Sequence, residues 1–240
     1  MTHAMLKSRL KATPAYFLFR RWQAHWELFS WNRSWAKGKA TEAPAFATPP
    51  RLFKQLLVSR YAAIYDSATF IETGTFLGDM VYAQRRHFHR LFSIEIDEPL
   101  HRRVQRRFSR LSNIHLLHGD SGSLLPTVLP SLQEPCLFWL DAHAMGSAQQ
   151  RLYPKPPILR ELEAILSSDL QDCVVLIDDA RLFFEGSPFP SIEKVKETVH
   201  HYRPDWQCEV RDDVIRVHRA MEITTPSSSP AAPLNRPRCD

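Results

Sequence analysis

Short apolar runs alternate with helix-like stretches along most of this chain. The runs are four to six residues long and cover 69–72, 91–95, 114–117, 136–141 and 174–178. Helical spacing of apolar residues predicts helices over 52–65, 77–88, 99–111, 123–132, 158–166 and 191–202. Because a helix between two strands lets them lie parallel, this alternation predicts an α/β fold with a doubly wound, mostly parallel sheet.

The rhythm changes near the end of the alternating region. Residues 207–211 and 214–218 both have the character of strands, and only Asp212 and Asp213 lie between them. Two residues suffice for a tight hairpin but not for a crossover helix, so we predict an antiparallel pair. Together with the five parallel strands, this C-terminal hairpin gives a seven-stranded, Rossmann-like sheet. An ordinary dinucleotide-binding fold would continue with another parallel strand instead.

Composition and charge divide the chain into three parts. With 240 residues, 44% hydrophobic and 24% charged, the sequence suits a globular protein with one α/β domain, which we place at 49–220. The segment 1–48 is a basic, Trp-rich arm, and the Ser- and Pro-rich segment 221–240 is expected to be disordered. The four cysteines form no close pair, which indicates neither a zinc site nor a disulfide framework.

The N-terminal arm can form an amphipathic helix over about 15–31. Such a helix suits an anionic membrane surface, packing on its own domain, or contact with a second copy of the chain, and all three stay open. No apolar window is long enough to span a membrane, and no secretory signal is recognisable. We therefore expect a cytoplasmic protein, with peripheral contact at the inner face of the membrane if the arm binds lipid.

The first strand is followed by a loop with two glycines. Glu72, Thr73 and Gly74 end the strand, and Gly78 precedes the next helix. Gly74 permits a tight turn close to a ligand, and Gly78 lets the helix begin near the sheet. The glycine spacing differs from that of pyrophosphate-binding loops, and the carboxylate of Glu72 would repel a pyrophosphate. The loop suits a cationic ligand with an amino group, although glycines in turns are equally common without any ligand.

Two further strands also end in polar residues. Glu95 ends the second strand, where a carboxylate can accept hydrogen bonds from both hydroxyls of a ribose. Asp97 suits a helix cap better, because a helix with proline in its first turn follows it. Asp120 and Ser121 follow the third strand and can hold an adenine amino group, but Asp120 can equally cap the next helix.

Five short motifs, taken in order, resemble those of class I S-adenosylmethionine (SAM)-dependent methyltransferases. They are Phe-Ile-Glu-Thr-Gly-Thr, Ser-Ile-Glu-Ile-Asp, His-Gly-Asp-Ser, Phe-Trp-Leu-Asp-Ala-His and Leu-Ile-Asp-Asp-Ala-Arg, within about 51–219. The last two are similar to motifs of metal-dependent, macrocin-type sugar O-methyltransferases. The resemblance implies a SAM site formed by Glu72, Thr73, Gly74, Gly78, Glu95, Asp120 and Ser121.

The resemblance also implies a metal site. It gives Asp141, Asp178 and Asp179 the role of metal ligands, and adjacent fourth and fifth strands would bring them together. An all-oxygen cluster suits a hard divalent cation, Mg²⁺ first. The alternative is a helix cap at Asp179 and a solvent-facing Asp141. His143 lies where the macrocin-type pattern carries a second Asp, so we assign catalysis to Asp141 and His143, with His143 as the base, although a loop histidine is as often a surface residue.

These residues together predict metal-assisted O-methylation with SAM and Mg²⁺ as cofactors. The expected acceptor is a sugar or another small hydroxylated molecule, from a glycan or a secondary metabolite. The basic arm leaves a nucleic-acid or protein methyltransferase as an alternative, but the base-holding motif of nucleic-acid enzymes is missing and no specific nucleic acid is expected. A non-catalytic, membrane-associated scaffold with the same fold is the other alternative. Homo-oligomer formation stays open.

Overall fold

The computed structural model of the chain describes residues 26, 48–133, 135–141 and 156–219. The predicted N-terminal arm, apart from Trp26 and Thr48, lies outside the described residues, and so does the predicted C-terminal tail. The loop that contains His143 lies outside them too. No helix among the described residues is long and apolar enough to cross a membrane.

Seven strands form one sheet in the order β3-β2-β1-β4-β5-β7-β6. Their bounds are β1 Thr69–Thr73, β2 Arg90–Glu95, β3 Ile114–His118, β4 Cys136–Leu140, β5 Cys173–Ile177, β6 Trp206–Arg211 and β7 Val214–Arg219. The first five strands pair parallel, whereas β7 runs antiparallel to both β5 and β6. The predicted α/β fold with a mostly parallel, seven-stranded sheet and a terminal hairpin is confirmed.

The helices follow the predicted alternation with one marked difference. They are α3 Arg51–Ile64, α4 Asp79–Gln84, α5 Glu98–Phe108, α6 Ser121–Val128, α8 Ile158–Ser167 and α9 Ile192–Tyr202, with 3-10 turns η2 Leu129–Ser131 and η3 Ala180–Leu182. The helix expected over 77–88 is only six residues long. It begins after Gly78, whose left-handed backbone (φ 72°) cannot belong to a right-handed helix. The apolar residues on both sides of α4 had extended the predicted helix too far.

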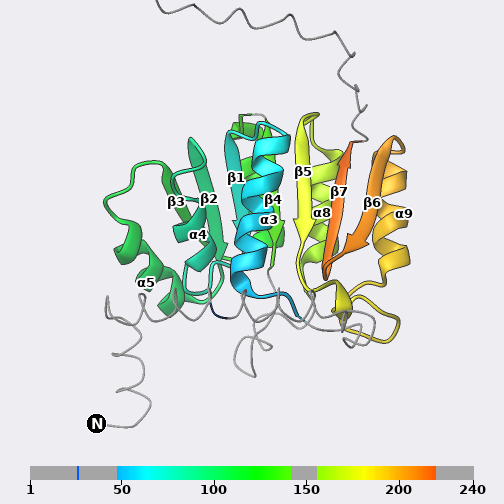
Figure 1. Cartoon of the computed structure of the whole chain (residues 1–240), viewed down its shortest axis with the longest axis horizontal. Helices are drawn as coiled ribbons and strands as arrows, with labels where there is room; N and C mark the ends of the chain where they lie inside the picture. The colour runs from blue at the N-terminus through cyan, green and yellow to red at the C-terminus, as the bar shows by residue number, and fades with distance from the viewer. Residues whose placement is uncertain (1–25, 27–47, 134, 142–155, 220–240) are drawn as a thin grey trace, which may run out of the picture.

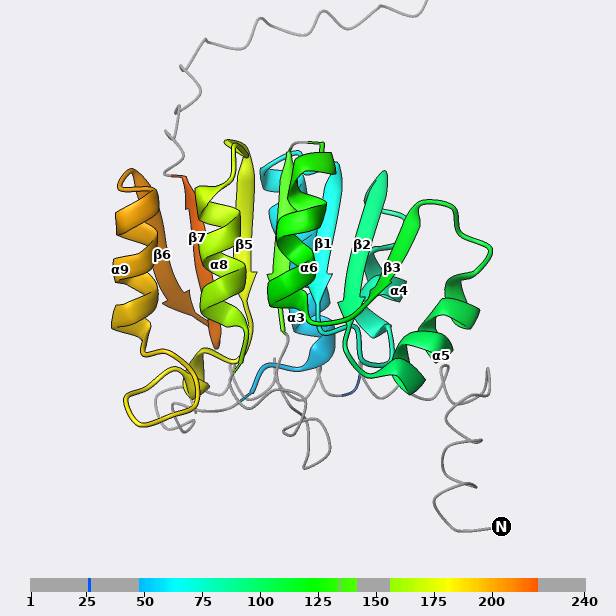
Figure 2. The same ribbon diagram turned by 180° about the vertical axis from the view of Figure 1, so that it is seen from behind.

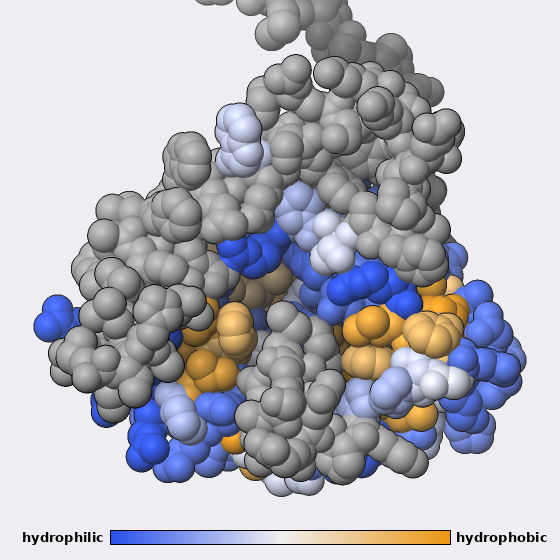
Figure 3. Space-filling model, turned by 90° about the horizontal axis from the view of Figure 1, so that it is seen from below, coloured by the Kyte–Doolittle hydropathy of each residue, from blue (hydrophilic) through white to orange (hydrophobic). Residues whose placement is uncertain are grey.

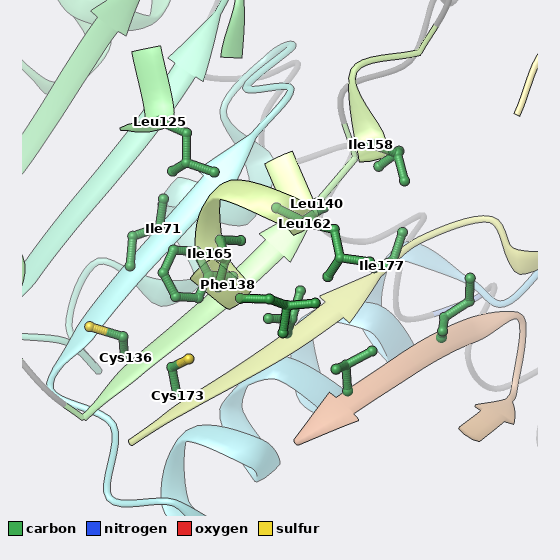
Figure 4. Close-up of a cluster of buried hydrophobic side chains, with 14 of the residues drawn as sticks. Ile71, Leu125, Cys136, Phe138, Leu140, Ile158, Leu162, Ile165, Cys173 and Ile177 are labelled. Carbon is green, nitrogen blue, oxygen red and sulfur yellow. The ribbon is translucent and has the colours of Figure 1, made fainter. Parts of the chain in front are cut away.

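Helices cover both faces of the sheet. Figure 1 shows α3, α4 and α5 on one side of the sheet, and Figure 2, seen from the opposite side, shows α6, α8 and α9 in front of the strands. Successive residues of a strand point to opposite faces, so the apolar strands feed two cores. Phe138 and Leu140 of β4 pack with Leu162 of α8, and Leu137 and Trp139 pack on the other side with α3. Figure 4 shows the core on the α8 side.

Candidate functional site

The carboxyl ends of the parallel strands lie along one edge of the sheet, at the bottom of Figure 1. Ligands of open α/β sheets bind at this edge, because loops there leave a crevice between the helices. Figure 3 looks onto this edge, where hydrophilic and hydrophobic side chains both reach the surface. The described residues predicted for the site end or follow strands β1, β2, β3, β4 and β5, so the fold brings them all to this edge.

The loop after β1 has the backbone that its glycines allow. Gly74 (φ 88°) and Gly78 (φ 72°) both adopt left-handed conformations. A Cβ atom at Gly78 would lie 2.8 Å from a ring carbon of Phe108 in α5. Gly78 therefore permits close packing of the loop against α5, whereas the sequence had suggested close packing against the sheet. Arg107 of α5 donates a hydrogen bond of 2.6 Å to the Leu77 carbonyl and fixes the loop from the same side.

Glu72 is a buried carboxylate at the end of β1, with 2% of its surface exposed. The Ser93 hydroxyl of β2 donates to Glu72 Oε2 at 2.5 Å and lies 2.6 Å from the Thr75 hydroxyl. Burial raises the pKa of Glu72 well above its ordinary value, and the nearby negative charge of Asp141 acts in the same direction. A cationic ligand would relieve this unfavourable burial of negative charge. Contact of Glu72 with such a ligand stays a prediction.

Glu95 is held beside the same loop. Its two carboxylate oxygens accept hydrogen bonds from the backbone N–H of Phe76 at 2.7 Å and of Asp97 at 2.9 Å. Burial raises the pKa of Glu95, and these backbone donors oppose the change. Asp97 caps α5 through the Leu100 N–H at 2.9 Å, which confirms its predicted structural role. The loop after β1 and the end of β2 are therefore linked through the Glu95 carboxylate.

The residues after β3 meet helix α8. Arg160 of α8 contacts both carboxylate oxygens of Asp120, at 3.0 and 3.2 Å, and the Ser123 hydroxyl donates to it at 2.7 Å. Burial raises the pKa of Asp120, but hydrogen bonds from Ser123 and Arg160 outweigh it and lower the pKa overall. Asp120 is the residue directly before α6, and its side chain accepts hydrogen bonds from Ser123 and Arg160. Contact of Asp120 with an adenine stays a prediction.

A buried acid that the sequence had not indicated lies behind the loop. Glu161 of α8 has no exposed surface, and burial raises its pKa to about 7. The hydroxyls of Ser121 and Thr73 are near enough to oppose this change in pKa. Among the described residues, however, neither of these hydroxyls nor the Glu161 carboxylate has a partner at hydrogen-bonding distance and angle. Glu161 occupies an apolar position of its helix, three residues after Ile158, and this misplaced charge was the signal available in the sequence.

Asp141, Asp178 and Asp179 come together where β4 and β5 end. One carboxylate oxygen from each lies within 4.8 Å of the other two. The predicted convergence of the three carboxylates is confirmed, because β4 and β5 are neighbours in the sheet. Asp179 has a left-handed backbone (φ 58°) before η3, and its side chain does not cap that turn. Asp141 is half-buried and its carboxylate lies with the other two, which favours the cluster over the alternative of a cap and a solvent-facing acid.

A lysine lies within this acidic cluster. Lys54 of α3 donates to Asp178 Oδ2 at 2.6 Å and to Asp179 Oδ1 at 3.1 Å. Burial lowers the pKa of Lys54, but the charges of Asp178 and Asp179 outweigh it, so the pKa is raised and the ammonium stays charged. Arg181 donates to the same Asp179 oxygen at 2.7 Å. The sequence had not indicated Lys54, although a basic residue in the first turn of a helix opposes the helix dipole.

Asp178 is the most enclosed member of the cluster. Its Oδ1 accepts from the Asp179 N–H at 2.7 Å, while its Oδ2 accepts from Lys54. Burial and the negative charge of Asp141 raise the pKa of Asp178, and Lys54 opposes them. Asp179 is joined through Arg181 to Asp213 in the β6–β7 turn, which also accepts from the Arg181 N–H at 2.8 Å. The cluster is thus connected to both α3 and the terminal hairpin.

Solved methyltransferase structures share this fold. The chain is similar to the O-methyltransferase TomG from Streptomyces achromogenes, involved in tomaymycin synthesis and solved with SAM, at 18% identity and a TM-score of 0.51. That match covers 75% of this chain and 83% of TomG. An O-methyltransferase from Bacillus cereus, solved with S-adenosylhomocysteine, is 14% identical over 78% of this chain and 88% of its own, with a TM-score of 0.48. No protein-family model matches the sequence, and no curated protein matches it either. The likeness to TomG confirms the methyltransferase fold.

Proposed function

We propose that this chain transfers the methyl group of SAM to an oxygen of a small hydroxylated acceptor, such as a sugar or a secondary metabolite. The single observation that carries the proposal is the pair of buried carboxylates, Glu72 and Glu95, at the ends of adjacent strands. Both adjoin a loop with left-handed glycines, so a ligand with cationic and ribose groups would satisfy both acids. SAM has this combination of groups.

The cofactor contacts follow from the positions of the strand ends. Gly74 and the backbone near Thr73 would contact the methionine part of SAM, beside the negative charge of Glu72. Glu95 would accept from the ribose hydroxyls, since each of its oxygens has a second lone pair besides the one that meets a backbone N–H. Asp120 and Ser121 would lie near the adenine. These contacts would place the sulfonium near β4, toward Asp141.

Methyl transfer requires a proton acceptor and an aligned oxygen. The acceptor oxygen attacks the methyl carbon, and the carbon–sulfur bond breaks. The electron pair of that bond stays on sulfur, so the sulfonium becomes the neutral thioether of S-adenosylhomocysteine. The hydroxyl proton passes to a base. The candidates are Asp141 and His143, which the sequence predicts as the base. Because the positive charge of the sulfonium disappears, the protein mainly supplies alignment and proton removal.

Metal assistance is the part of the sequence-based hypothesis that the site fits poorly. Three carboxylate oxygens are the right donors for Mg²⁺. The Lys54 ammonium, however, already lies against Asp178 and Asp179, and Arg181 lies against Asp179. A divalent cation would have to displace Lys54 or bear its repulsion at close range. The residues as arranged do not fit a resident metal.

Turnover of SAM against a panel of acceptors tests the proposal. Release of S-adenosylhomocysteine would be measured with sugars, sugar phosphates and phenols, using the wild-type chain and the variants Asp141→Asn and His143→Ala. We expect turnover with at least one hydroxylated acceptor and a fall of about 100-fold or more in at least one variant, the usual loss for a general base. Turnover with a nucleic acid or a protein alone would favour the alternative methyltransferases.

The scaffold alternative makes a different prediction for the free protein. A non-catalytic scaffold with a degenerate cofactor site would release no S-adenosylhomocysteine with any acceptor and would bind neither SAM nor its demethylated product. Binding of SAM without turnover would leave the cofactor site intact and would contradict the choice of acceptor class. Peripheral membrane contact through the arm stays a separate prediction, which vesicle binding would test.

A further inference from the structure

We propose that Lys54 is the resident cation of the acidic cluster, standing in place of a divalent metal ion and holding Asp178 and Asp179 in position on the acceptor side of the site. The inference deepens the proposed function, on which its catalytic meaning rests. Lys54 acts through the two aspartates, so it is a positioning residue. The binding chemistry of the cluster can be measured without SAM or an acceptor.

The Lys54 ammonium lies against two carboxylates of the cluster. Lys54 Nζ lies 2.6 Å from Asp178 Oδ2 and 3.1 Å from Asp179 Oδ1. The three carboxylate oxygens of the cluster lie within 4.8 Å of one another, so a metal bound to them would lie in the region that Nζ contacts. A metal at the usual distance of about 2.0–2.6 Å from these carboxylates would lie beside the Lys54 ammonium, and the two positive charges would repel each other. Lysine and metal therefore compete for the same carboxylates.

Lys54 lies in the first turn of its helix, an unfavourable place for a cation. Lys54 is the fourth residue of α3, and the first turn of α3 contains no acidic residue. A cation at a helix N-terminus meets the positive end of the helix dipole, which is unfavourable. The Lys54 side chain is also only 12% exposed, which adds a desolvation cost. Both costs are offset by the ion pairs that Lys54 makes with two carboxylates after β5.

The alternation of the strands explains why α3 supplies this cation. Leu137 and Trp139 of β4 face the α3 side, and so do Val174 and Leu176 of β5. Continuing this alternation by one step places Asp141 and Asp178 toward the same face. The amino end of α3 lies at the carboxyl edge of the sheet (Figure 1), so a long side chain in its first turn reaches the cluster. A residue on α6 or α8 would lie on the opposite face.

Arg181 completes the charge balance of the cluster. It contacts Asp179 and is itself held by Asp213 through both its backbone N–H and its guanidinium. Asp178 and Asp179 thus each contact a positive side chain of the chain itself. Removal of the Lys54 ammonium should expose an all-oxygen cluster that attracts a hard divalent cation. The gain of metal binding on removal of a lysine is the distinguishing expectation.

Binding of Mn²⁺, followed by electron paramagnetic resonance of the free ion, tests this expectation. Mn²⁺ would be titrated into the full chain as wild type, Lys54→Met, Asp178→Asn and the double variant Lys54→Met with Asp178→Asn. The matched control is Lys194→Met, because Lys194 also lies in the first turn of a helix and pairs with a carboxylate, Glu197, but is exposed. Circular dichroism would check that each variant is folded.

We expect no Mn²⁺ binding at the cluster in the wild type or in Lys194→Met. Lys54→Met should gain a site at least about tenfold tighter than any in the wild type, since a nearby positive charge is removed, and Asp178→Asn should abolish the gain. Binding in the wild type that Asp178→Asn alone abolishes would overturn the inference, as would a folded Lys54→Met without the gain. If Lys54→Met does not fold, Lys54→Gln and the wild-type titration decide between the same outcomes.

Discussion

The buried acid Glu161 gives a prediction for the pH dependence of stability. Its carboxylate lies between the end of β1 and the start of α6, with no exposed surface. Burial raises its pKa from the ordinary 4.5 to about 7. In the unfolded chain the group loses its proton near the ordinary pKa, whereas in the folded chain it keeps the proton up to about pH 7. The folded state binds more protons between these values, so stability must fall as pH rises through them.

The size of the effect follows from the two pKa values. Their difference corresponds to roughly 3 kcal/mol, which the folded chain has lost once the pH exceeds about 7. A glutamine at this position has nearly the same shape and no charge. We therefore expect Glu161→Gln to be more stable than the wild type by up to roughly 3 kcal/mol at pH 8, with the advantage shrinking toward pH 5.

Urea unfolding at a series of pH values measures this difference. Other buried acids also titrate, so the quantity compared is the free energy of unfolding of Glu161→Gln minus that of the wild type. Glu163→Gln is the matched control, because Glu163 lies on the same helix but is exposed, and its substitution should leave the pH dependence unchanged. A difference for Glu161→Gln that is constant from pH 5 to pH 8 would refute the reasoning.

Two further predictions concern stability near the site. Gly78→Ala should cost about 1–3 kcal/mol, because it combines a left-handed backbone with a Cβ contact of 2.8 Å to Phe108, whereas Gly186→Ala has the same backbone problem without the contact and should cost less. Asp213→Asn should cost about 1–3 kcal/mol, because it removes the negative charge that pairs with Arg181 in a part-buried ion pair. Asparagine also tolerates the left-handed backbone of this position, so the backbone adds no cost of its own. Chemical denaturation checks both.

Each stability prediction has an outcome that would contradict it. Equal losses in Gly78→Ala and Gly186→Ala would show that the ring contact carries no weight. For Asp213, the control is Asp205→Asn, since Asp205 pairs with Arg219 where both side chains are more than half exposed. Exposed pairs contribute about 0–1 kcal/mol, so an equal loss in the two variants would contradict the special role of the Asp213 contact.

The fold could be predicted from sequence because its signals are local and repeated. Buried parallel strands are apolar on both faces, and the strands at 136–140 and 173–177 show this as uninterrupted apolar runs. The hairpin was predictable because Asp212 and Asp213 leave room for nothing longer than a turn, and both adopt the left-handed backbone that such a turn needs. Helix lengths were less certain, since nothing local shows how far the apolar flanks of α4 continue a helix.

The acids at the strand ends were predictable, but their partners were not. Glu72, Glu95 and Asp178 end strands, and a strand end is recognisable along the sequence. Lys54 lies 124 residues before Asp178 and belongs to a helix that the sequence marks only as amphipathic. Arg160 likewise meets Asp120 across 40 residues. Such pairs depend on which helix crosses which strand end, which follows from the packed fold and not from local spacing.

Calorimetric titration with SAM tests the central claim most directly. We expect the wild type to bind SAM and S-adenosylhomocysteine, and Glu95→Gln to bind SAM roughly 10- to 100-fold more weakly, because hydrogen bonds to a charged group contribute about 1.5–3 kcal/mol. Asp97→Asn is the control: Asp97 caps α5 and should change affinity little. The absence of heat with both SAM and S-adenosylhomocysteine in the wild type, or an equal loss of affinity in the two variants, would contradict the account.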